Sequence, residues 1–373
     1  MLRIGINGAD LEGRGTGVKR YLSSILPYLE CNDSEYFLYS RASLPEELIP
    51  KKKCFNRRPT GHSADKSYTF WEQLVLPRRL KKDSIDIFLS AGYSIPLFMK
   101  IPSIVVIHDL SFSAHPEWYD RREGLRRRLI TRMSARRAKK VITVSQFSKM
   151  ELASRYRIPD AKITIAPNAS SLRNLELKQP AKKRIGQKYN LGSPVILYVG
   201  LLLERRYIRQ LIEAFGIIRK NHKNAALVLV GKNQLNPNTS VIKLAQSASV
   251  KDSVIHLEYI SDAELAALYD TADIFVYLSS YEGFGIPPLE ALSAGTPVVT
   301  SRSSSLEEIY EGSALLVEDH TPEEIASKIN LLLSDGKLRN RLLTSGKNLT
   351  KKFSWKKTAD IINSEIKVLS EKL

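Results

Sequence analysis

Cysteine is scarce in this sequence, with Cys31 and Cys54 as the only two among 373 residues. Two cysteines make neither a disulfide framework nor a zinc cluster, and so low a number is typical of proteins kept in a reducing compartment. We therefore expect both side chains to be inert packing residues.

Long apolar stretches are absent as well. No run reaches the roughly 18 apolar residues that indicate a membrane-spanning helix. The chain opens with Met1-Leu2-Arg3-Ile4-Gly5, which is typical of a strand and lacks the apolar segment of a signal peptide. The sequence therefore predicts a protein that is made and kept in the cytoplasm.

Positive charge is in excess, and the excess is uneven. The net charge is +18, with 31 Lys and Arg against 17 Asp and Glu in residues 1–175 and 26 against 22 in residues 176–373. Most of the excess therefore belongs to the first half. A basic surface of this kind attracts anionic partners such as membranes or nucleic acids.

The densest basic segment is 121–140, which holds ten Lys and Arg residues. Within it, Leu125, Leu129, Ile130 and Met133 recur at helical spacing, so a basic amphipathic helix is predicted. Such a helix can lie on an anionic membrane, or it can pack its apolar stripe against its own domain. We favour internal packing for the stripe and membrane attraction for the basic excess. Nucleic acid is the weaker alternative, because the sequence has no zinc-finger, ribonucleoprotein or helix-turn-helix motif.

Apolar runs alternate with helical patterns along the chain, as in doubly wound α/β units, and the length allows two domains. Residues 173–193 are predicted to be a linker, and residues 32–80 show no clear pattern. The predicted strands are 2–6, 85–89, 103–107, 140–144, 195–199, 226–230, 254–257, 274–278 and 297–300. The predicted helices are 17–28, 207–220, 262–271, 287–294, 322–334 and 358–369.

The segment from Ser280 to Val299 is the most informative one. An apolar strand leads into a loop with Glu282 and two glycines, and a helix that carries Glu290 follows, begun by two prolines and ended by Gly295. Loop glycines let the backbone approach a ligand, and the N–H groups of a helix start attract phosphate or hydroxyl oxygens. Either glutamate alone could be an ordinary loop or early-helix acid, but the combination indicates a ligand site.

A second group of residues follows another predicted strand, where Gly200 precedes Arg205 and Arg206. Two adjacent cations after a glycine at the carboxyl end of a parallel strand are well placed to neutralise a diphosphate. Gly231 has a similar place after the next strand, although one glycine is weak evidence. The structural alternative is a pair of surface arginines at a turn, and the Glu282 loop makes the functional interpretation the better one.

Together these segments resemble the Glu-x7-Glu signature of retaining family 4 glycosyltransferases of GT-B fold. The match includes Gly283-Phe284-Gly285, Pro288-Leu289-Glu290-Ala291 and Ala294-Gly295-Thr296-Pro297. The resemblance extends over nearly the whole chain, from the first strand to the last helix. It implies that residues 32–80, which match no family segment, contribute to acceptor recognition.

The resemblance implies an α/β fold of the GT-B type, with two Rossmann-like, doubly wound parallel-sheet domains that face an interdomain cleft. The N-terminal, acceptor-side domain would span residues 1–172, and a C-terminal helix at 355–373 would cross back to complete it. After the linker, residues 194–354 would form the nucleotide-sugar-binding domain.

Roles for individual residues also follow from the resemblance. Arg205 and Arg206 would act in catalysis by binding the donor diphosphate, where the family has an Arg-Lys pair; the second arginine keeps the charge but replaces an ammonium by a planar fork. Glu282 would support the donor sugar during catalysis, and Glu290 would bind the ribose hydroxyls. The other implied donor-binding residues are Gly15, Thr16, Gly17, Gly200, Gly231, Gly283, Phe284, Gly285 and Ile286.

In the first half, Gly13-Arg14-Gly15-Thr16-Gly17 lacks the Gly-x-Gly-x-x-Gly spacing of a dinucleotide site, which disfavours a hydride-transfer enzyme. It resembles the family's glycine loop, whose backbone N–H groups reach the donor phosphate. His108 and Asp109 end a predicted strand and match the family's His-Asp motif. A histidine at a strand end is more often structural, whereas the resemblance implies that His108 is catalytic and contacts the sugar or its leaving phosphate. Asp109 would orient it.

The implied reaction moves a hexosyl unit with retention of configuration to a hydroxyl of a saccharide or lipid-linked acceptor. It needs neither a metal ion nor a bound cofactor. The variant looks most like bacterial mannosyl- and rhamnosyltransferases of surface-polysaccharide assembly, so GDP-mannose is the expected donor and a UDP-sugar the alternative. A non-catalytic protein that binds nucleotide sugars or nucleic acid is the alternative from another class. The basic first domain predicts a peripheral position on the cytoplasmic face of the plasma membrane.

Overall fold

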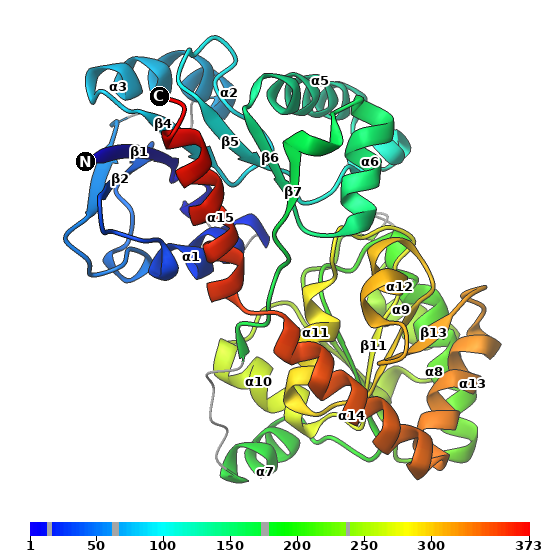
Figure 1. Ribbon diagram of the computed structural model, residues 1–373. Helices are drawn as coiled ribbons and strands as arrows, with labels where there is room; N and C mark the ends of the chain where they lie inside the picture. Colours follow the sequence, from blue (N-terminus) through cyan, green and yellow to red (C-terminus); the bar gives the residue numbers. More distant parts are fainter. Residues whose placement is uncertain (13–16, 62–66, 173–178, 236–238) are drawn as a thin grey trace. The chain divides into compact units, whose positions relative to one another are not determined.

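The computed structural model describes residues 1–12, 17–61, 67–172, 179–235 and 239–373, with only the backbone described for residues 179–183. The chain divides into two compact units, unit 1 (Met1–Asn168 with Ser354–Leu373) and unit 2 (Ala169–Phe353). Each unit is a parallel sheet with helices packed around it (Figure 1). The predicted fold class, two doubly wound parallel-sheet units, is confirmed.

Unit 1 has a seven-stranded sheet in the order β3-β2-β1-β4-β5-β6-β7, and each neighbouring pair is parallel. Its strands are β1 Leu2–Asn7, β2 Ser34–Ser40, β3 Phe55–Pro59, β4 Ile87–Ser90, β5 Ser103–Val106, β6 Lys140–Thr143 and β7 Ile163–Ile165. The helical elements that matter below are η1 Ala9–Leu11, α1 Gly17–Ile25, η2 Leu26–Tyr28, α2 Tyr68–Phe70, η4 Trp71–Val75, α3 Leu76–Lys82, α4 Ser111–Ala114, α5 Arg121–Arg137, α6 Gln146–Tyr156 and α15 Trp355–Ser370.

Unit 2 has a six-stranded parallel sheet in the order β10-β9-β8-β11-β12-β13. Its strands are β8 Val195–Val199, β9 Ala226–Val230, β10 Val254–Leu257, β11 Ile274–Tyr277, β12 Val298–Ser301 and β13 Leu315–Val317. Its helices are α7 Gln179–Lys188, η8 Glu204–Arg206, α8 Ile208–Asn221, α9 Val241–Ser247, α10 Asp262–Thr271, α11 Ile286–Ala294, α12 Ser304–Tyr310, α13 Pro322–Ser334 and α14 Gly336–Lys352.

The C-terminal helix α15 completes unit 1, as the resemblance implied. It packs beside α1 (Figure 1), and its Ile362 and Ile366 are buried. Glu365 forms an ion pair with Lys140 at 3.1 Å, and the Thr358 hydroxyl donates a hydrogen bond to a backbone carbonyl of the strand-exit segment 166–168. Apolar contacts and buried polar contacts together therefore hold the end of the chain on the first sheet.

The predicted linker at 173–193 is only partly a linker. Residues 173–178 lie outside the described residues, but α7 occupies most of the remainder and packs on α10, where Lys188 is paired with Glu264. The division between the units falls between Asn168 and Ala169. The lysine-rich composition concealed this surface helix from the sequence analysis. Among its described side chains, Ile185 is the one that is apolar and buried.

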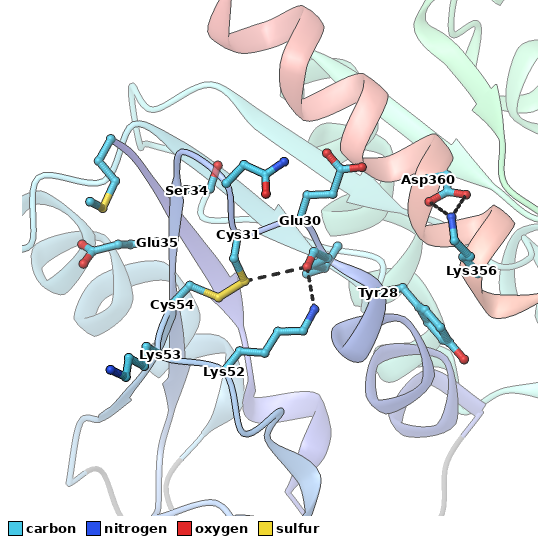
Figure 2. A pocket seen from close by; sticks show the side chains of 13 residues that line it. Tyr28, Glu30, Cys31, Ser34, Glu35, Lys52, Lys53, Cys54, Lys356 and Asp360 are labelled. Atoms are coloured by element: carbon cyan, nitrogen blue, oxygen red, sulfur yellow. Dashed lines mark hydrogen bonds and ion pairs between the residues drawn. A yellow bond between two sulfur atoms is a disulfide. The ribbon is translucent and has the colours of Figure 1, made fainter.

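None of the helices in the described ranges is both long and apolar enough to cross a bilayer. An open cavity of about 730 Å³ lies in unit 1 at the amino ends of β1 and β2 (Figure 2). It is lined by Met1, Tyr28, Leu29, Glu30, Cys31, Asn32, Ser34, Glu35, Lys52, Lys53, Cys54, Lys356 and Asp360.

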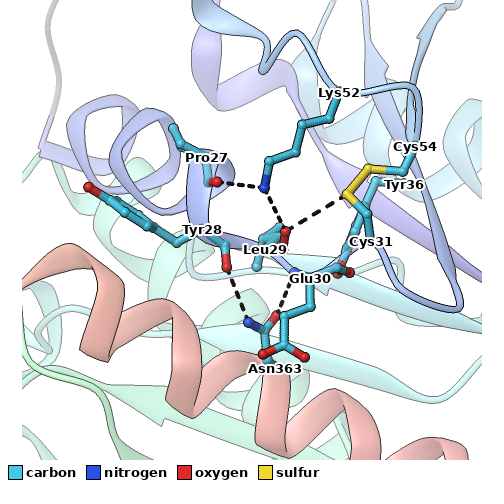
Figure 3. The surroundings of a disulfide bond; sticks show 9 residues. All are labelled: Pro27, Tyr28, Leu29, Glu30, Cys31, Tyr36, Lys52, Cys54 and Asn363. Atoms are coloured by element: carbon cyan, nitrogen blue, oxygen red, sulfur yellow. Dashed lines mark hydrogen bonds between the residues drawn. A yellow bond between two sulfur atoms is a disulfide. The ribbon is translucent and has the colours of Figure 1, made fainter.

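Cys31 and Cys54 form a disulfide, so the expectation of two inert packing residues is wrong (Figure 3). They precede the neighbouring parallel strands β2 and β3, and this places their Cα atoms 5.8 Å apart despite a separation of 23 residues in the sequence. The pairing was hidden because neither strand was predicted. It also removes the argument from reduced cysteines for a cytoplasmic location.

Candidate functional site

The loops after β8 and β11 meet at the carboxyl end of the sheet in unit 2. β8 and β11 are neighbours, and at this point the strand order changes direction, which is where ligands bind in open α/β sheets. The Ser280 N–H donates to the Arg205 carbonyl at 3.0 Å and thereby joins the two loops. The structure thus brings together the arginine pair and the glutamate loop that the sequence singled out separately.

Arg206 and Glu282 form an ion pair at the centre of this junction. Arg206 Nη2 lies 2.9 Å from Glu282 Oε1, and the two side chains are only 11% and 13% exposed. The guanidinium also lies over the face of Tyr277, 4.9 Å from the ring centre. Burial opposes the charge of Arg206, but Glu282 and the nearby tyrosine hydroxyls outweigh it and raise the Arg206 pKa well above its usual value. The site therefore holds a permanent cation and a carboxylate in contact.

Two glycines make room for this arrangement. Gly200 has φ +146°, and a Cβ there would lie 2.3 Å from Arg206 Nη1. Gly231 has φ +141°, and its Cβ would lie 2.0 Å from the Gly200 carbonyl oxygen. Any side chain at either position would collide with the arginine loop, which explains both glycines without reference to a ligand. Their predicted donor contacts remain predictions.

The Glu282 loop is held by a row of serines that the sequence analysis missed. The Glu282 N–H donates to Ser304 Oγ at 3.0 Å, and Ser305 Oγ donates to the Glu282 carbonyl at 2.9 Å. Ser303 Oγ donates to the Ser279 carbonyl at 2.6 Å. The signal was the run Ser301-Arg302-Ser303-Ser304-Ser305, which follows β12 and begins α12. The loop is thus fixed by the adjacent strand-to-helix connection.

The rest of the glutamate segment forms the start of α11, one residue earlier than predicted. Gly285 precedes the helix at φ +80° and, as a glycine, has no side chain to cap it. The Tyr310 hydroxyl donates to the Gly285 carbonyl. Gly283 and Phe284 are buried, and the Phe284 ring packs edge-on against Phe353, so these two residues could contact a sugar only through their backbone groups.

Glu290 lies on α11 and is fully buried. The Tyr269 hydroxyl of α10 donates to its Oε2 at 3.1 Å. A ribose contact would therefore have to share this carboxylate with Tyr269. That role stays a prediction, and the structure adds a packing role that the sequence did not reveal.

In unit 1, His108 follows β5 and is held by the backbone. Its Nε2 lies 2.9 Å from the Ala91 carbonyl oxygen, so Nε2 carries a proton, and its ring packs edge-on against Tyr21 at 4.8 Å. Burial lowers the pKa of His108 and favours the neutral imidazole. The expected orienting partner was Asp109, whereas the structure gives that task to Ala91.

Asp109 has a different place, because its carboxylate caps the next helix. Asp109 Oδ1 accepts hydrogen bonds from Ser111 N and Oγ at 2.8 and 2.7 Å, at the start of α4. Oδ2 accepts one from the Tyr93 hydroxyl at 3.3 Å. Exposed N–H groups at a helix start attract a nearby carboxylate more strongly than a neutral imidazole does.

Of the glycine loop in unit 1, Gly15 and Thr16 lie outside the described residues. Gly17 begins α1 and is exposed. The predicted contacts of this loop with donor phosphate therefore stay predictions.

A pair of carboxyl groups near the carboxyl ends of β1 and β4 escaped the sequence analysis. Asp10 follows β1, and burial raises its pKa to about 7, with further contributions from the neighbouring Glu72 and Glu12. Glu72, on η4, is 1% exposed and accepts hydrogen bonds from Ser94, Gln73 and Tyr68. Gly92 allows this approach, because a Cβ there would lie 2.5 Å from Asp10 Oδ2. Asp10 could have been noticed after the first strand, but nothing in residues 32–80 signalled Glu72.

The cavity in Figure 2 lies at the amino ends of the strands of unit 1, whereas Asp10 and His108 follow the carboxyl ends of β1 and β5. Ligands of open α/β sheets bind at the carboxyl ends of the strands, so the cavity is not the predicted site. Across the described ranges, no three or more His, Cys, Asp or Glu side chains are grouped to hold a metal ion.

Comparison with known families assigns both halves of the chain. Residues 15–172 match Glycosyltransferase Family 4, and residues 181–349 match Glycosyl transferases group 1. The chain belongs to the family 4 glycosyltransferases. It is therefore a glycosyltransferase, and the two matches together span both units.

Among curated relatives, the O-antigen chain mannosyltransferase B of Escherichia coli is 30% identical over 267 residues, which cover 70% of this chain and 69% of that protein. The O-antigen chain mannosyltransferase RfbU of Salmonella typhimurium is 26% identical over 326 residues, with 84% and 86% covered. The match to the serotype-specific mannosyltransferase WbdA of Escherichia coli covers only 32% of that protein.

Among solved structures, Anabaena HepE in complex with UDP and glucose superposes with a TM-score of 0.75 at 18% identity, and each chain is covered completely. At this identity the likeness concerns the fold alone. It agrees with the two parallel-sheet units.

Proposed function

We propose that this glycosyltransferase moves a mannosyl unit from GDP-mannose, with retention of configuration, to a hydroxyl of a saccharide or lipid-linked acceptor in cell-surface polysaccharide assembly. Two relatives that are O-antigen chain mannosyltransferases by name support the sugar and the process. A UDP-sugar is the second candidate donor, because no contact among the described residues distinguishes one nucleotide base from another.

The observation that carries the proposal is the buried contact between Arg206 and Glu282. Breaking a sugar–phosphate bond places negative charge on the leaving diphosphate and positive charge on the anomeric carbon. A guanidinium and a carboxylate 2.9 Å apart offer one fixed charge to each. Because each side chain already orders the other, donor binding has less side-chain entropy to lose.

In the proposed reaction the anomeric C–O bond to the diphosphate breaks, and a bond from the same carbon to the acceptor oxygen forms on the same face. The acceptor proton passes to the leaving diphosphate oxygen. The proposal includes no metal ion, because the two arginines would neutralise the charge of the diphosphate. Arg205 and Arg206 bind the diphosphate, Glu282 supports the donor sugar, and Glu290 binds the ribose. We assign His108 as the neutral imidazole of unit 1 that contacts the sugar or the leaving phosphate.

The proposed location is peripheral, on the cytoplasmic face of the plasma membrane. It is supported by the net charge of residues 1–175, which hold 31 basic and 17 acidic side chains. An anionic leaflet attracts such a surface within about a Debye length.

The test is a donor screen with the full chain, in which hydrolysis and saturation-transfer NMR are measured for GDP-mannose, GDP-fucose, UDP-glucose, UDP-galactose and UDP-N-acetylglucosamine. We expect GDP-mannose to give the strongest signals and EDTA to leave its hydrolysis unchanged. A preference for a UDP-sugar would replace the donor and keep the enzyme class. Absence of binding to every donor would support a non-catalytic role and overturn the proposal.

A further inference from the structure

Helix α5 turns its large apolar side chains outward. Leu125, Leu129 and Met133 are 51%, 51% and 48% exposed. Their spacing of four residues places them in one row along the helix. The positions that face the domain are instead small or polar, namely Gly124, Thr131, Ser134 and Ala135. The expectation that the apolar stripe packs within its own domain is therefore wrong for these three residues, whereas Ile130 is half-buried.

Small side chains explain why α5 packs in this orientation. Ser134 Oγ lies close enough to accept a hydrogen bond from the Ile95 N–H at 3.1 Å, and Ala135 is fully buried. A leucine at either position would force α5 away from the segment that follows β4. The inner face is thus committed to the domain, and the leucine row is left on the outside.

The outer surface of α5 is also strongly basic. The helix contains eight arginines and a single acid, Glu123. Glu123 is already shared by Arg126 and Arg127, at 2.7 Å from each. Within the described part of the chain, no carboxylate pairs with the arginines at positions 121, 122, 132 and 137. An apolar row flanked by uncompensated cations is typical of a helix that lies in a membrane interface.

Segments packed beside α5 expose further apolar side chains. The loop that ends in Phe98 is joined to α5 through Ile95 and to η4 through Gln73, which binds both Ile95 and Leu97. Phe98 is 83% exposed, and Leu74 on η4 is 44% exposed. Two segments next to α5 therefore expose apolar side chains as well.

We propose that α5 is a membrane-docking helix, in which Leu125, Leu129 and Met133 enter the acyl boundary of an anionic bilayer while the flanking arginines bind lipid phosphates. An anionic bilayer is the partner favoured by charge, because α5 is strongly basic. A second copy docked through the same face would bring this basic helix against an identical one, and like charges repel at close range. Nucleic acid would satisfy the arginines but would leave the leucine row in water.

This docking would explain the proposed peripheral location, and it rests on that proposal only for which leaflet is bound. It is tested with the full chain and without any sugar, so its outcome is independent of the donor screen. Vesicles of phosphatidylglycerol and phosphatidylethanolamine are compared with vesicles of phosphatidylcholine in flotation assays at low and high salt.

Two α5 variants separate the apolar from the electrostatic contribution. The apolar variant is Leu125→Ser/Leu129→Ser/Met133→Ser, and its control is Ile242→Ser/Leu331→Ser, because those side chains are exposed on unit 2. The basic variant is Arg122→Gln/Arg132→Gln/Arg137→Gln, and its control is Lys337→Gln/Arg341→Gln/Lys347→Gln on α14. Thermal unfolding confirms that each variant folds, as is expected for exposed positions.

We expect the apolar variant to bind anionic vesicles at least about tenfold more weakly, and the basic variant to lose about fivefold for each arginine at low salt. The two controls should bind like the parent chain. A Leu129→Trp reporter should shift its emission to the blue on anionic vesicles only. Unchanged binding of the apolar variant would overturn the proposal, and so would a parent dimer that the apolar variant converts to a monomer in light scattering.

Discussion

Arg206 and Glu282 depend on each other, since both are nearly buried and lie 2.9 Å apart. Loss of either partner would leave an uncompensated charge at a site that water barely reaches, at a cost of about 3 kcal/mol in unfolding free energy. A loss of activity in either single variant therefore needs a stability measurement beside it. Glu282→Gln retains the shape and is the better probe of the charge.

Glu290 is the residue at which a binding role and a packing role can be separated. Glu290→Gln keeps the volume and the contact with Tyr269, so we expect little change in thermal stability. If the carboxylate accepts hydrogen bonds from ribose hydroxyls, GDP affinity should fall about tenfold, because a charge-assisted bond is lost. Calorimetric titration measures this, with Tyr269→Phe as the control for packing. Unchanged affinity in Glu290→Gln would remove the ribose role.

Asp10 predicts a pH dependence of stability. Its pKa is raised from 3.8 to about 7 in the folded chain, so the native state keeps a proton that the unfolded chain has already lost. Stability from this group is complete below about pH 4 and is lost as the pH rises towards 7. Asp10→Asn should remove that loss, which is about 4 kcal/mol for the full shift, and raise the unfolding temperature at pH 8 by about 10 °C, with no difference at pH 4. Calorimetric scans across this range test it, and equal curves at pH 8 would refute the raised pKa.

At the scale of elements, Gly200 after β8 and Gly231 after β9 make room for the loop that carries Arg206. Gly231→Ala should cost unit 2 about 3 kcal/mol, because the residue has φ +141° and its Cβ would lie 2.0 Å from the Gly200 carbonyl oxygen. GDP binding should weaken with it, since the Arg206 loop has to move.

The matched control for Gly231→Ala is Gly186→Ala on α7, where nothing lies within 4 Å of the added Cβ. That substitution should be neutral or stabilise by up to about 1 kcal/mol. Equal effects at the two glycines, measured by denaturant titration, would contradict the proposed role of the glycine contact.

The sequence predicted elements well where they are long or strongly apolar. β8, β9, α10 and α13 have their predicted bounds, because buried parallel strands and capped helices leave local signals. β7 and β13 were missed because each has only three residues. β2 and β3 were missed in a stretch whose polar residues obscured the pattern, and the disulfide between their leading loops was missed with them.

Site geometry was less accessible than the elements. Both members of the Arg206–Glu282 pair were selected, but their contact depends on the neighbouring positions of β8 and β11, which no local pattern encodes. The predictions that Asp109 orients His108 and that the apolar stripe of α5 packs inward were wrong for the same reason. In each case a tertiary contact, the start of α4 or the small inner residues of α5, decided where the side chain points.

At the scale of the molecule, charge and chemistry are distributed over different units. Unit 1 carries most of the net positive charge and the outward row of α5, whereas unit 2 carries the buried cation and carboxylate proposed to meet the donor. Variants on α5 should therefore change vesicle binding without changing GDP affinity, and variants at Arg206 should do the reverse.

Calorimetric titration of GDP into the parent chain, Arg206→Ala and Arg341→Ala tests the central claim most directly. Arg341 is exposed on α14 and serves as the control for removing one arginine from unit 2. If Arg206 binds the donor diphosphate, Arg206→Ala should lose at least about tenfold in affinity, because a charge-assisted contact is removed, while Arg341→Ala binds like the parent. Equal affinity for GDP in all three proteins, with Arg206→Ala still folded, would contradict the claim.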